Sequence, residues 1–478
     1  MFPNPLRPVP EPLPQHVSKE LEAAVGSDWV LTEADRLLVY ECDAQTAHRF
    51  PPRAVVLPKD TGEVADVLAI LHGEGIPVVP RGAGTGLSGG ALATGGAVVV
   101  GTSRMNRILE LDAENRRALL QCGVVNSVLS AAAAPYGLFY APDPSSQTAC
   151  TIGGNVGENS GGPHCLKYGV TTRYVTGLRV VLPDGEVVWL GGQGRESPAL
   201  DLVGLFVGSE GCLGLATEVE VALLPLPAAT RTLLATFETL EAAGRAVTDI
   251  IGAGLLPAAL EIVDRNTIQA VEASVFAAGY PVDAGAALVV EFDGVDSGLD
   301  DDAEEAARCC REAGAGEIRR ARTEEERQAL WKGRKKAFGT MGRLAPDLLV
   351  QDATVPRTRL PEVLGKVTEI ADRYGLRVAN VFHAGDGNLH PNIVFDRRDE
   401  EETRRVLTAS KEIMAACVEV GGTITGEHGV GVDKRRYMPM VFSSSELEAL
   451  ARVKGIFDPK GTFNPGKVLP DPDQGGAS

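Results

Sequence analysis

One glycine-rich stretch, PRGAGTGLSGG at residues 80–90, constrains the fold of this chain more than any other feature. It follows an apolar run, residues 76–79, that predicts a short buried strand. Its five glycines let successive main-chain N–H groups turn toward one anionic ligand, because no Cβ atom blocks the approach. The stretch therefore favours a pyrophosphate-binding loop over its alternative, an ordinary tight turn.

The same stretch contains the spacing of a dinucleotide-binding fingerprint, Gly84-x-Gly86-x-x-Gly89. Such a fingerprint must open the helix of a crossover between parallel strands, which needs about a dozen residues. Here more glycines follow at once, and the run AVVV at residues 97–100 already predicts the next strand. We therefore expect no helix between the two strands, and we expect the amides that bind the ligand to come from the loop itself.

Two further stretches repeat this composition. Residues 151–162, TIGGNVGENSGG, follow the segment YAPDPSSQT, and residues 207–214 read VGSEGCLG. The strand-like run at residues 217–224 comes next. A single glycine-rich loop is weak evidence, but three of them in one region favour one long ligand that lies across several loops.

Charge and cysteine content exclude several classes of function. The net charge of −18 argues against nucleic acid and against unaided binding to an anionic membrane. No apolar run approaches the roughly 18–20 residues that span a bilayer, so direct membrane insertion is not expected. Eight scattered cysteines without a CxxC pair suggest reduced thiols in a cytosolic protein, and neither a disulfide framework nor a cysteine-held iron–sulfur cluster. Six prolines among the first fourteen residues predict an extended tail and no signal peptide, so we expect a cytoplasmic location.

Periodicity and capping signals predict the main helices and strands. In the first half, Thr61 is expected to cap one helix and Asn126 an alanine-rich one that ends at Gly137. From about Pro225 the composition changes to strand-like runs that alternate with polar helices, as in a second α+β domain. The predicted elements there are strands at 231–237, 287–292 and 376–382, and helices from a Thr323/Glu326 capping box to Arg343, from Pro361 at the first helical position to Gly375, and over 399–420.

Three of the seven histidines lie in two glycine-flanked turns near the C-terminus. His383 and His390 belong to HAGDGNLHPN, and His428 follows Glu427 in GGTITGEHGVG. The glycines make a helix unfavourable, so His383 and His390 would have to converge through a strand and a turn. Two imidazoles and a carboxylate suit a divalent metal such as Zn²⁺ or Mn²⁺. The alternative is a set of separate, hydrogen-bonded loop histidines.

Taken together, these motifs resemble a known family. The stretches PRGAGTGLSGGA, YAPDPSSQTACTIGGNVGENSGG, HCLKYG, GSEGCLG, NVFHAGDGNLHPN, GGTITGEHGVG and FDPKGTFNPGK are similar to those of FAD-linked oxidases with the vanillyl-alcohol-oxidase (PCMH) type of flavin domain. Within that family, the likeness is greatest to the FAD-binding subunits of bacterial glycolate oxidase and to D-lactate and D-2-hydroxyglutarate dehydrogenases. It extends over nearly the whole chain from about residue 50.

The resemblance implies an α+β fold. It implies a tail and helix over residues 1–50, a two-part PCMH-type FAD domain over 51–226, and an α+β substrate (cap) domain with an antiparallel sheet over 227–424. The C-terminal segment, 425–478, would return to the FAD domain and complete the active site. Companion subunits, one that also binds FAD and one that holds an iron–sulfur cluster, are the expected partners, and through them the protein would lie at the periphery of the membrane.

The resemblance also assigns roles to single residues. His383, His390 and Glu427 would hold the metal, His428 would be the catalytic base, Asn392 would touch the substrate, and Arg343 would bind its carboxylate. FAD would be wrapped by residues Arg81, Gly82, Ala83, Gly84, Thr85, Gly86, Leu87, Ser88, Gly89, Pro142, Asp143, Ser145, Ser146, Gly153, Gly154, Asn155, Asn159, Gly208, Ser209, Glu210, Gly211, Gly214, Asn464 and Lys467. We expect the FAD to be non-covalent, because the first loop contains no histidine or cysteine that could attack the flavin ring.

The expected activity is the oxidation of a small D-2-hydroxy acid, glycolate or D-lactate, to the 2-oxo acid. A metal lowers the pKa of a bound hydroxyl, a histidine accepts its proton, and a flavin takes the hydride. The 2-hydroxyglutarate enzymes place a lysine near the position of residues 350–352, and its absence here favours a monocarboxylate. The alternatives are a D-2-hydroxyglutarate dehydrogenase, a metal-dependent hydrolase that binds a nucleotide, and a flavin-bearing scaffold without chemistry of its own.

Overall fold

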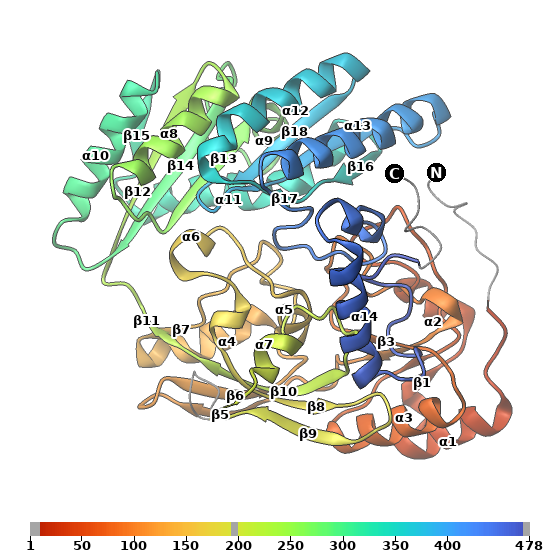
Figure 1. The fold of residues 1–478 in the computed structure, drawn as a ribbon. Coiled ribbons are helices and arrows are strands. Elements are labelled where there is room, and N and C mark those ends of the chain that lie inside the picture. Colours follow the sequence, from red (N-terminus) through yellow and green to blue (C-terminus); the bar gives the residue numbers. More distant parts are fainter. Residues whose placement is uncertain (1–9, 193–198, 472–478) are drawn as a thin grey trace. The chain divides into compact units, whose positions relative to one another are not determined.

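The computed structural model describes residues 10–192 and 199–471, shown in Figure 1. The chain packs into two compact units. Among the described residues, the central unit consists of Gly162–Gly169 and Pro227–Gly426, and the terminal unit consists of residues 10–161, 170–192, 199–226 and 427–471. The chain thus leaves the terminal unit twice and returns to it each time, so that each unit is assembled from segments far apart in the sequence.

The first sheet of the terminal unit holds the glycine-rich loop. Its strands are β1 (Val30–Leu31), β2 (Val55–Val56), β4 (Val98–Gly101) and β3 (Val78–Arg81), in the order β1-β2-β4-β3. β3 and β4 are parallel, and apart from a short 3₁₀ turn at Thr94–Gly96 their connection contains no helix. This confirms that the loop itself joins two strands. The C-terminal segment joins the free edge of β3, where the N–H of Asn464 donates to the carbonyl of Val78 (2.7 Å).

Helices α1 (Gln15–Val25) and α3 (Thr61–Gly73) pack against each other. α1 lies beside β1, and α3 packs against β8 (Val175–Val181) and β10 (Leu215–Ala222) of the second sheet of the unit. α3 buries Val64, Val67, Leu68 and Leu71, the apolar stripe that the helical spacing predicts. Its N-cap is one residue earlier than expected, because the carboxylate of Asp60 accepts from the N–H of Glu63 at 3.0 Å. A carboxylate at this position also faces the positive end of the helix dipole.

The second sheet of the terminal unit is antiparallel, in the order β5-β6-β10-β8-β9. Its strands are β5 (Ile108–Asp112), β6 (Arg117–Gln121), β10 (Leu215–Ala222), β8 (Val175–Val181) and β9 (Val187–Gly191), and the strand predicted at residues 217–224 is β10 followed by β11 (Leu224–Pro225). β11 pairs with β7 (Leu138–Phe139). α7 (Leu202–Phe206), α2 (Ala34–Leu37) and α14 (Ser444–Phe457) complete the unit.

The Asn126 prediction was wrong in its detail. Helix α4 (Asn126–Ala133) starts after Val125 without a side-chain cap, and a 3₁₀ turn (Ala134–Tyr136) leads to Gly137. The amide of Asn126 instead donates to the carbonyl of Pro142 and to Oδ1 of Asn155, both at 3.0 Å. The side chain is therefore used in a buried tertiary contact, which a local capping rule does not detect.

The second glycine-rich stretch is also not the loop that its composition predicts. Ile152–Glu158 forms helix α5, whose N-cap Thr151 accepts from the N–H of Gly154 at 3.2 Å. Glycine is required at position 153, because a Cβ atom there would lie 2.7 Å from Cβ of Cys122. The short helix α6 (Cys165–Tyr168) follows, in the segment of the chain that packs with the central unit.

The central unit is built on one large antiparallel sheet. Its main path is β15-β12-β14-β13-β18-β19-β17, and β20 pairs with both β16 and β18. The strands are β12 (Ala229–Phe237), β13 (Ala259–Asp264), β14 (Ala286–Gly294), β15 (Ile318–Arg320), β16 (Asp347–Val350), β17 (Ala353–Thr354), β18 (Arg377–His383), β19 (Asn388–Leu389) and β20 (Pro391–Phe395). β13 is buried along its whole length, which requires cover on both faces of the sheet.

Two groups of helices supply that cover (Figure 1). α8 (Leu240–Gly252) packs against α10 (Leu299–Glu312) and α12 (Leu360–Tyr374), and α12 packs against α13 (Glu400–Glu419). α9 (Arg265–Glu272) packs against α11 (Glu324–Thr340), and both bury side chains in a core with Leu234, Val263 and Val289. The predicted helices near 323–343, 361–375 and 399–420 are confirmed, except that Pro361 is the second residue of α12 and not the first.

The cysteines and the lengths of the helices bear on two further expectations. All eight cysteines are free, as predicted, and six of them are buried. None of the described helices is both long enough and apolar enough to cross a bilayer.

Truncation of the core behind β12 gives a stability test. Leu234 is 2% exposed in the core that α9 and α11 cover, so Leu234→Ala should lower the free energy of unfolding by about 2–5 kcal/mol. Leu256→Ala, at a side chain 58% exposed in the same unit, should cost far less. Urea unfolding measures both, and equal losses would contradict this account of the core.

Candidate active site

The turn after β18 brings two predicted metal ligands together in the central unit. His383 is the last residue of β18 and pairs with Asn388 of β19, and His390 lies between β19 and β20. The rings of the two histidines are 5.1 Å apart and nearly perpendicular. The turn needs glycine at position 387, where φ is +80° and a Cβ atom would lie 2.2 Å from the carbonyl oxygen of Val355. The two imidazoles thus converge through a strand and a turn, as expected.

A buried carboxylate orients the ring of His383. Nδ1 of His383 lies 2.9 Å and 3.0 Å from the two carboxylate oxygens of Glu261, a β13 residue with no exposed surface. Because a carboxylate accepts hydrogen bonds, Nδ1 carries the proton and Nε2 keeps the lone pair that a metal requires. This arrangement of a carboxylate behind a histidine is typical of metal-binding histidines.

Arg334 completes this cluster, and neither it nor Glu261 was predicted as a site residue from the sequence. The guanidinium of Arg334 forms an ion pair with Glu261 and lies 3.4 Å from Nδ1 of His383. Arg334 belongs to a basic run at residues 332–336, yet only 4% of it is exposed. The missed signal is its spacing from Leu330, Trp331 and Ala337, which puts Arg334 on the apolar face of α11.

A second buried carboxylate lies beside His390. Oδ1 of Asp352 is 3.6 Å from Nδ1 of His390, and Asp352 has no exposed surface. Asp352 also accepts from the hydroxyl of Thr425 (2.6 Å) and from the N–H of Gly426 (3.0 Å). Glu427 and His428 are the next two residues of the chain. The residues directly before them, Thr425 and Gly426, are therefore fixed by Asp352, which lies beside His390.

The other two residues assigned to the substrate differ in their surroundings. Asn392 is 1% exposed in β20, and its amide nitrogen donates to the carbonyl of His390 at 2.7 Å. Oδ1 of Asn392 is buried without a hydrogen-bond partner among the described residues. Arg343, in contrast, is exposed in the 3₁₀ turn (Met341–Arg343) that follows α11. Of the two arginines, Arg334 is the one beside His383.

In the terminal unit, the three glycine-rich stretches meet. A Cβ atom on Gly82 would lie 2.6 Å from Oγ1 of Thr151, and one on Gly90 would lie 2.9 Å from a carboxylate oxygen of Glu158, so the first loop packs along α5. A Cβ atom on Gly211 would lie 2.6 Å from Cγ of Pro80, which brings the third stretch to the base of the same loop. Side chains at these positions would force the stretches apart.

The first loop presents donors that the protein does not satisfy. The main-chain N–H groups of residues 83–90 make no hydrogen bond to the described parts of the chain. The buried hydroxyls of Ser88 and Ser209 likewise have no partner there. Because buried polar groups are almost always paired, this row of donors suits a ligand with several acceptor oxygens, such as a pyrophosphate.

The side chain of Arg81 is held by residues of the N-terminal segment. Its guanidinium is buried and donates to the carbonyl of Cys42 at 2.9 Å, and it lies over the ring of Tyr40. A Cβ atom on Gly84 would overlap Arg81, so the loop folds directly over the guanidinium. Burial lowers the pKa of Arg81, while the charge of Asp43 opposes that shift. The guanidinium of Arg81 therefore packs under the first loop at Gly84 and is in a position to stabilise the conformation of that loop.

The remaining residues assigned to the cofactor fall into two groups. The N–H groups of Gly153, Gly208 and Glu210 already donate to carbonyls, and the amide of Asn155 is engaged with Asn126. Asn159 ends α5 in the left-handed region, and its Oδ1 accepts from Thr172. Pro142 is buried, Ser145 is exposed, and Asp143, Ser146 and Gly214 are partly or fully buried at the margins of the same stretches.

Buried hydrogen bonds of Glu210 join the third glycine-rich stretch to the segment after His428 and to the C-terminal segment. Its two carboxylate oxygens accept from the N–H groups of Val430 (2.6 Å) and Gly431 (2.7 Å), and its own carbonyl accepts from the amide of Asn464 (2.6 Å). Burial raises the pKa of Glu210, while the two N–H donors oppose that shift. Lys467 extends the network by donating to Oδ1 of Asn464 and to the carbonyl of Leu92, and burial lowers its pKa to about 8.

The comparisons with known proteins agree with this arrangement. Residues 52–191 match the model of an FAD binding domain, and residues 226–468 match that of the C-terminal domain of FAD linked oxidases. Two solved structures show the same fold. These are p-cresol methylhydroxylase (TM-score 0.80, 17% identity) and 4-ethylphenol oxidase from Gulosibacter chungangensis (0.78, 19%), each covering 97% of this chain and 99% of that one.

Curated relatives are much closer in sequence. The glycolate oxidase subunit GlcD of Escherichia coli K12 is 48% identical over 92% of this chain and 88% of its own length. The Bacillus subtilis GlcD is 43% identical (90% and 92%), and a D-lactate dehydrogenase of Anaerostipes hadrus is 35% identical (87% and 89%). With the predicted α+β, PCMH-type fold confirmed and both domain models matched, the chain belongs to the FAD-linked oxidases and is an FAD-dependent oxidoreductase.

Proposed function

We propose that this protein oxidises a small 2-hydroxy acid, glycolate or D-lactate, to the corresponding 2-oxo acid. The observation that carries the proposal is the buried pair of His383 and His390, with Glu261 fixing the tautomer of His383, in a chain that is 48% identical to a glycolate oxidase subunit. The hydrolase and scaffold alternatives are set aside, because membership of the FAD-linked oxidases makes the glycine-rich region a cofactor site.

We assign His383, His390 and Glu427 as the residues that would hold a divalent metal. The donor set suits Zn²⁺ or Mn²⁺, and the Glu261 carboxylate behind His383 is the support that such a ligand needs. When bound, the metal would act as a Lewis acid on the hydroxyl and carboxylate oxygens of the substrate. Asp352 would hold the segment that leads to Glu427 through its bonds to Thr425 and Gly426.

Residues of the chain would accept the proton of the substrate and bind its polar groups. His428 would accept the hydroxyl proton, which requires its neutral form, and Asn392 would use its buried Oδ1 toward the substrate. A positive charge must face the substrate carboxylate, and Arg334 is better placed for this than Arg343, because it is buried beside His383. The flavin would supply the acceptor for the hydride.

The surroundings of His390 support a monocarboxylate. Gln351 is tied to Ser410 by a 2.8 Å hydrogen bond, and Asp352 is a buried acid. A second carboxylate of the substrate, placed beside His390, would face the carboxylate of Asp352, and residues 350–352 contain no lysine to balance it. D-2-hydroxyglutarate is therefore the less favoured alternative.

The organisation of the chain supports a role within a larger enzyme. We propose that residues 51–226 and 425–478 bind non-covalent FAD, that residues 227–424 bind the substrate, and that residues 1–50 form the N-terminal tail and helix. Two relatives are named as subunits of glycolate oxidase, so we also propose a companion FAD-binding subunit and an iron–sulfur subunit as partners. We propose a cytoplasmic location, peripheral to the membrane through these partners.

A substrate panel with a dye acceptor tests the proposed activity. Glycolate and D-lactate should both be oxidised, because a pocket separates substrates that differ by one methyl group by only about 1–3 kcal/mol. The purified protein should be yellow, and acid precipitation should release the colour into the supernatant. A higher kcat/KM for 2-hydroxyglutarate, or colour that stays in the pellet, would contradict the substrate class or the non-covalent flavin, respectively.

Substitutions at two adjacent residues test their separate roles. Glu427→Gln should lower metal content and activity together, and excess Mn²⁺ or Zn²⁺ should restore part of the activity. His428→Asn should keep metal and FAD but lose about 10²–10⁴-fold in kcat, the usual contribution of a general base. Metal analysis of both purified variants decides the matter. A normal metal load in Glu427→Gln, or a lost one in His428→Asn, would reverse the assignment.

Glu210 gives a third test, because its carboxylate holds the main chain just after His428. Glu210→Gln replaces an acceptor oxygen with an amide that cannot accept from both N–H groups. If Glu210 positions His428, kcat should fall about 10²-fold while FAD content stays high, since misplacement by about 1 Å has that effect. Glu114→Gln, at an exposed residue of the same unit, is the control. Loss of FAD with normal kcat per flavin would instead make Glu210 a cofactor contact.

A further inference from the structure

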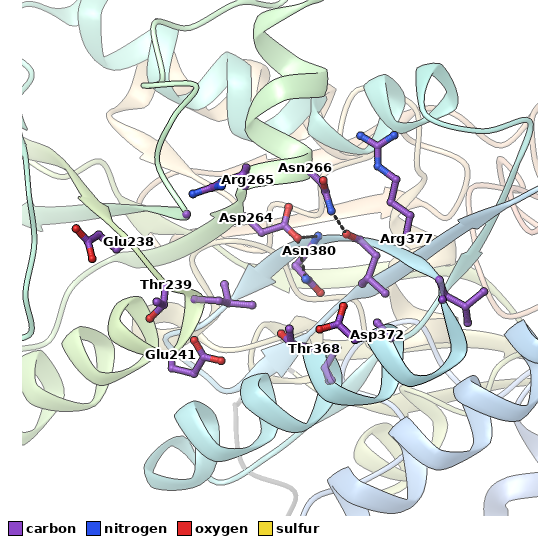
Figure 2. Close-up of a pocket in the computed structure, with 17 residues that line it drawn as sticks. Glu238, Thr239, Glu241, Asp264, Arg265, Asn266, Thr368, Asp372, Arg377 and Asn380 are labelled. Carbon is purple, nitrogen blue, oxygen red and sulfur yellow. Dashed lines mark hydrogen bonds between the residues drawn. The ribbon is translucent and has the colours of Figure 1, made fainter.

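A pocket lies within the central unit, away from the paired histidines. Its volume is about 650 Å³, and its floor is formed where β13 ends and β18 begins (Figure 2). Thr239, the N-cap of α8, and Glu241 of α8 form one part of its wall, and α12 contributes Thr368 and Asp372. This volume falls in the range of small-molecule sites, about 300–1,000 Å³.

The alternation of side chains along a strand places this pocket on the other face of the sheet. Glu261 and His383 face each other across β13 and β18, and the same register, continued by three residues along each strand, brings Asp264 opposite Asn380. An odd number of residues along a strand reverses the face to which a side chain points. The face with Glu261 and His383 is covered by α9 and α11, whereas Asn380 lines a pocket between α8 and α12.

The floor of the pocket presents an unsatisfied acceptor. Asp264 accepts from the backbone N–H and from the amide nitrogen of Asn380, both at 2.8 Å, and from the N–H of Thr267. These bonds fix the orientation of the Asn380 amide, because its oxygen could not face the carboxylate. Only 5% of Asn380 is exposed, and its Oδ1 is buried without a hydrogen-bond partner among the described residues.

The rim of the pocket carries an excess of negative charge. Glu238, Glu241 and Asp372 lie around the opening in Figure 2, while Arg265 and Arg377 lie at its other side. With Asp264 at the floor, acidic side chains outnumber basic ones among the lining residues. The hydroxyl of Thr368 donates to the carbonyl of Leu364 (3.1 Å) and keeps its lone pairs as acceptors, whereas that of Thr239 already accepts from the N–H of Ala242 (3.2 Å). An occupant that donates hydrogen bonds and carries positive charge fits these groups best.

We propose that this pocket binds a small aliphatic amine through its ammonium group. Oδ1 of Asn380 accepts one N–H of the ammonium, and Glu241 and Asp372 balance its charge. The 2-hydroxy acid proposed as the substrate is an anion and has no N–H donor. The ligand proposed for this pocket is therefore a different compound. Because the pocket and the paired histidines lie on opposite faces of the sheet, the binding site does not depend on the proposed activity.

Titration calorimetry of the FAD-loaded full-length protein with 1,4-diaminobutane tests the proposal. We expect saturable binding of one molecule per chain. Asp372→Lys should weaken this binding at least tenfold, since it places a positive charge at the rim. Asp249→Lys, which changes an exposed aspartate of α8 outside the pocket, should bind within twofold of the unchanged protein. Succinate, of similar length and opposite charge, should not bind.

Three outcomes would overturn the proposal. They are the absence of saturable binding, equal affinities in the Asp372→Lys and Asp249→Lys variants, and competition between succinate and the diamine for one site. Turnover of the 2-hydroxy acid is measured in parallel for both variants and should be unchanged. A failure of the proposed activity would thus be seen in the turnover assay, and a failure of the amine site only in the calorimetry.

Discussion

The carboxylate of Glu210 is the interaction on which the terminal unit most depends. It lies in a fully desolvated position that disfavours a charge, and the N–H groups of Val430 and Gly431 offset that cost. Hydrogen bonds to a charged group contribute about 1.5–3 kcal/mol each. Through Asn464, the same residue also fixes the C-terminal segment that runs along β3. One side chain thus determines where the segment after His428 meets the glycine-rich region.

A comparable buried charge organises the central unit. Glu261, Arg334 and His383 lie on β13, α11 and β18, and all three are nearly inaccessible to solvent. Removal of one partner would leave a buried charge uncompensated, at a cost of about 3–5 kcal/mol. The cluster therefore sets the tautomer of His383 and also ties a helix to the middle of the sheet. Precise placement of a metal ligand and stability of the unit depend on the same contacts.

Sequence reasoning succeeded where the signal is local. The glycine spacing at residues 80–90 predicted a loop between strands, and the glycines around His383 predicted a strand and turn. It failed where a distant partner competes for the same group. Asn126 resembled a helix cap, but its amide is bonded to Pro142 and Asn155.

The sequence by itself determined the class of fold, the family and the motifs that carry the chemistry, because periodicity, capping and glycine spacing act over a few residues. Only the tertiary structure decided which charged groups are buried and what each one faces. Arg334 and Arg343 lie on one basic segment, yet burial separates the residue beside His383 from the one at the surface. The register of β13 and β18 likewise assigned His383 and Asn380 to opposite faces of one sheet. The pairing of β13 with β18 joins residues more than a hundred positions apart, so the contacts that select it form only when the chain folds.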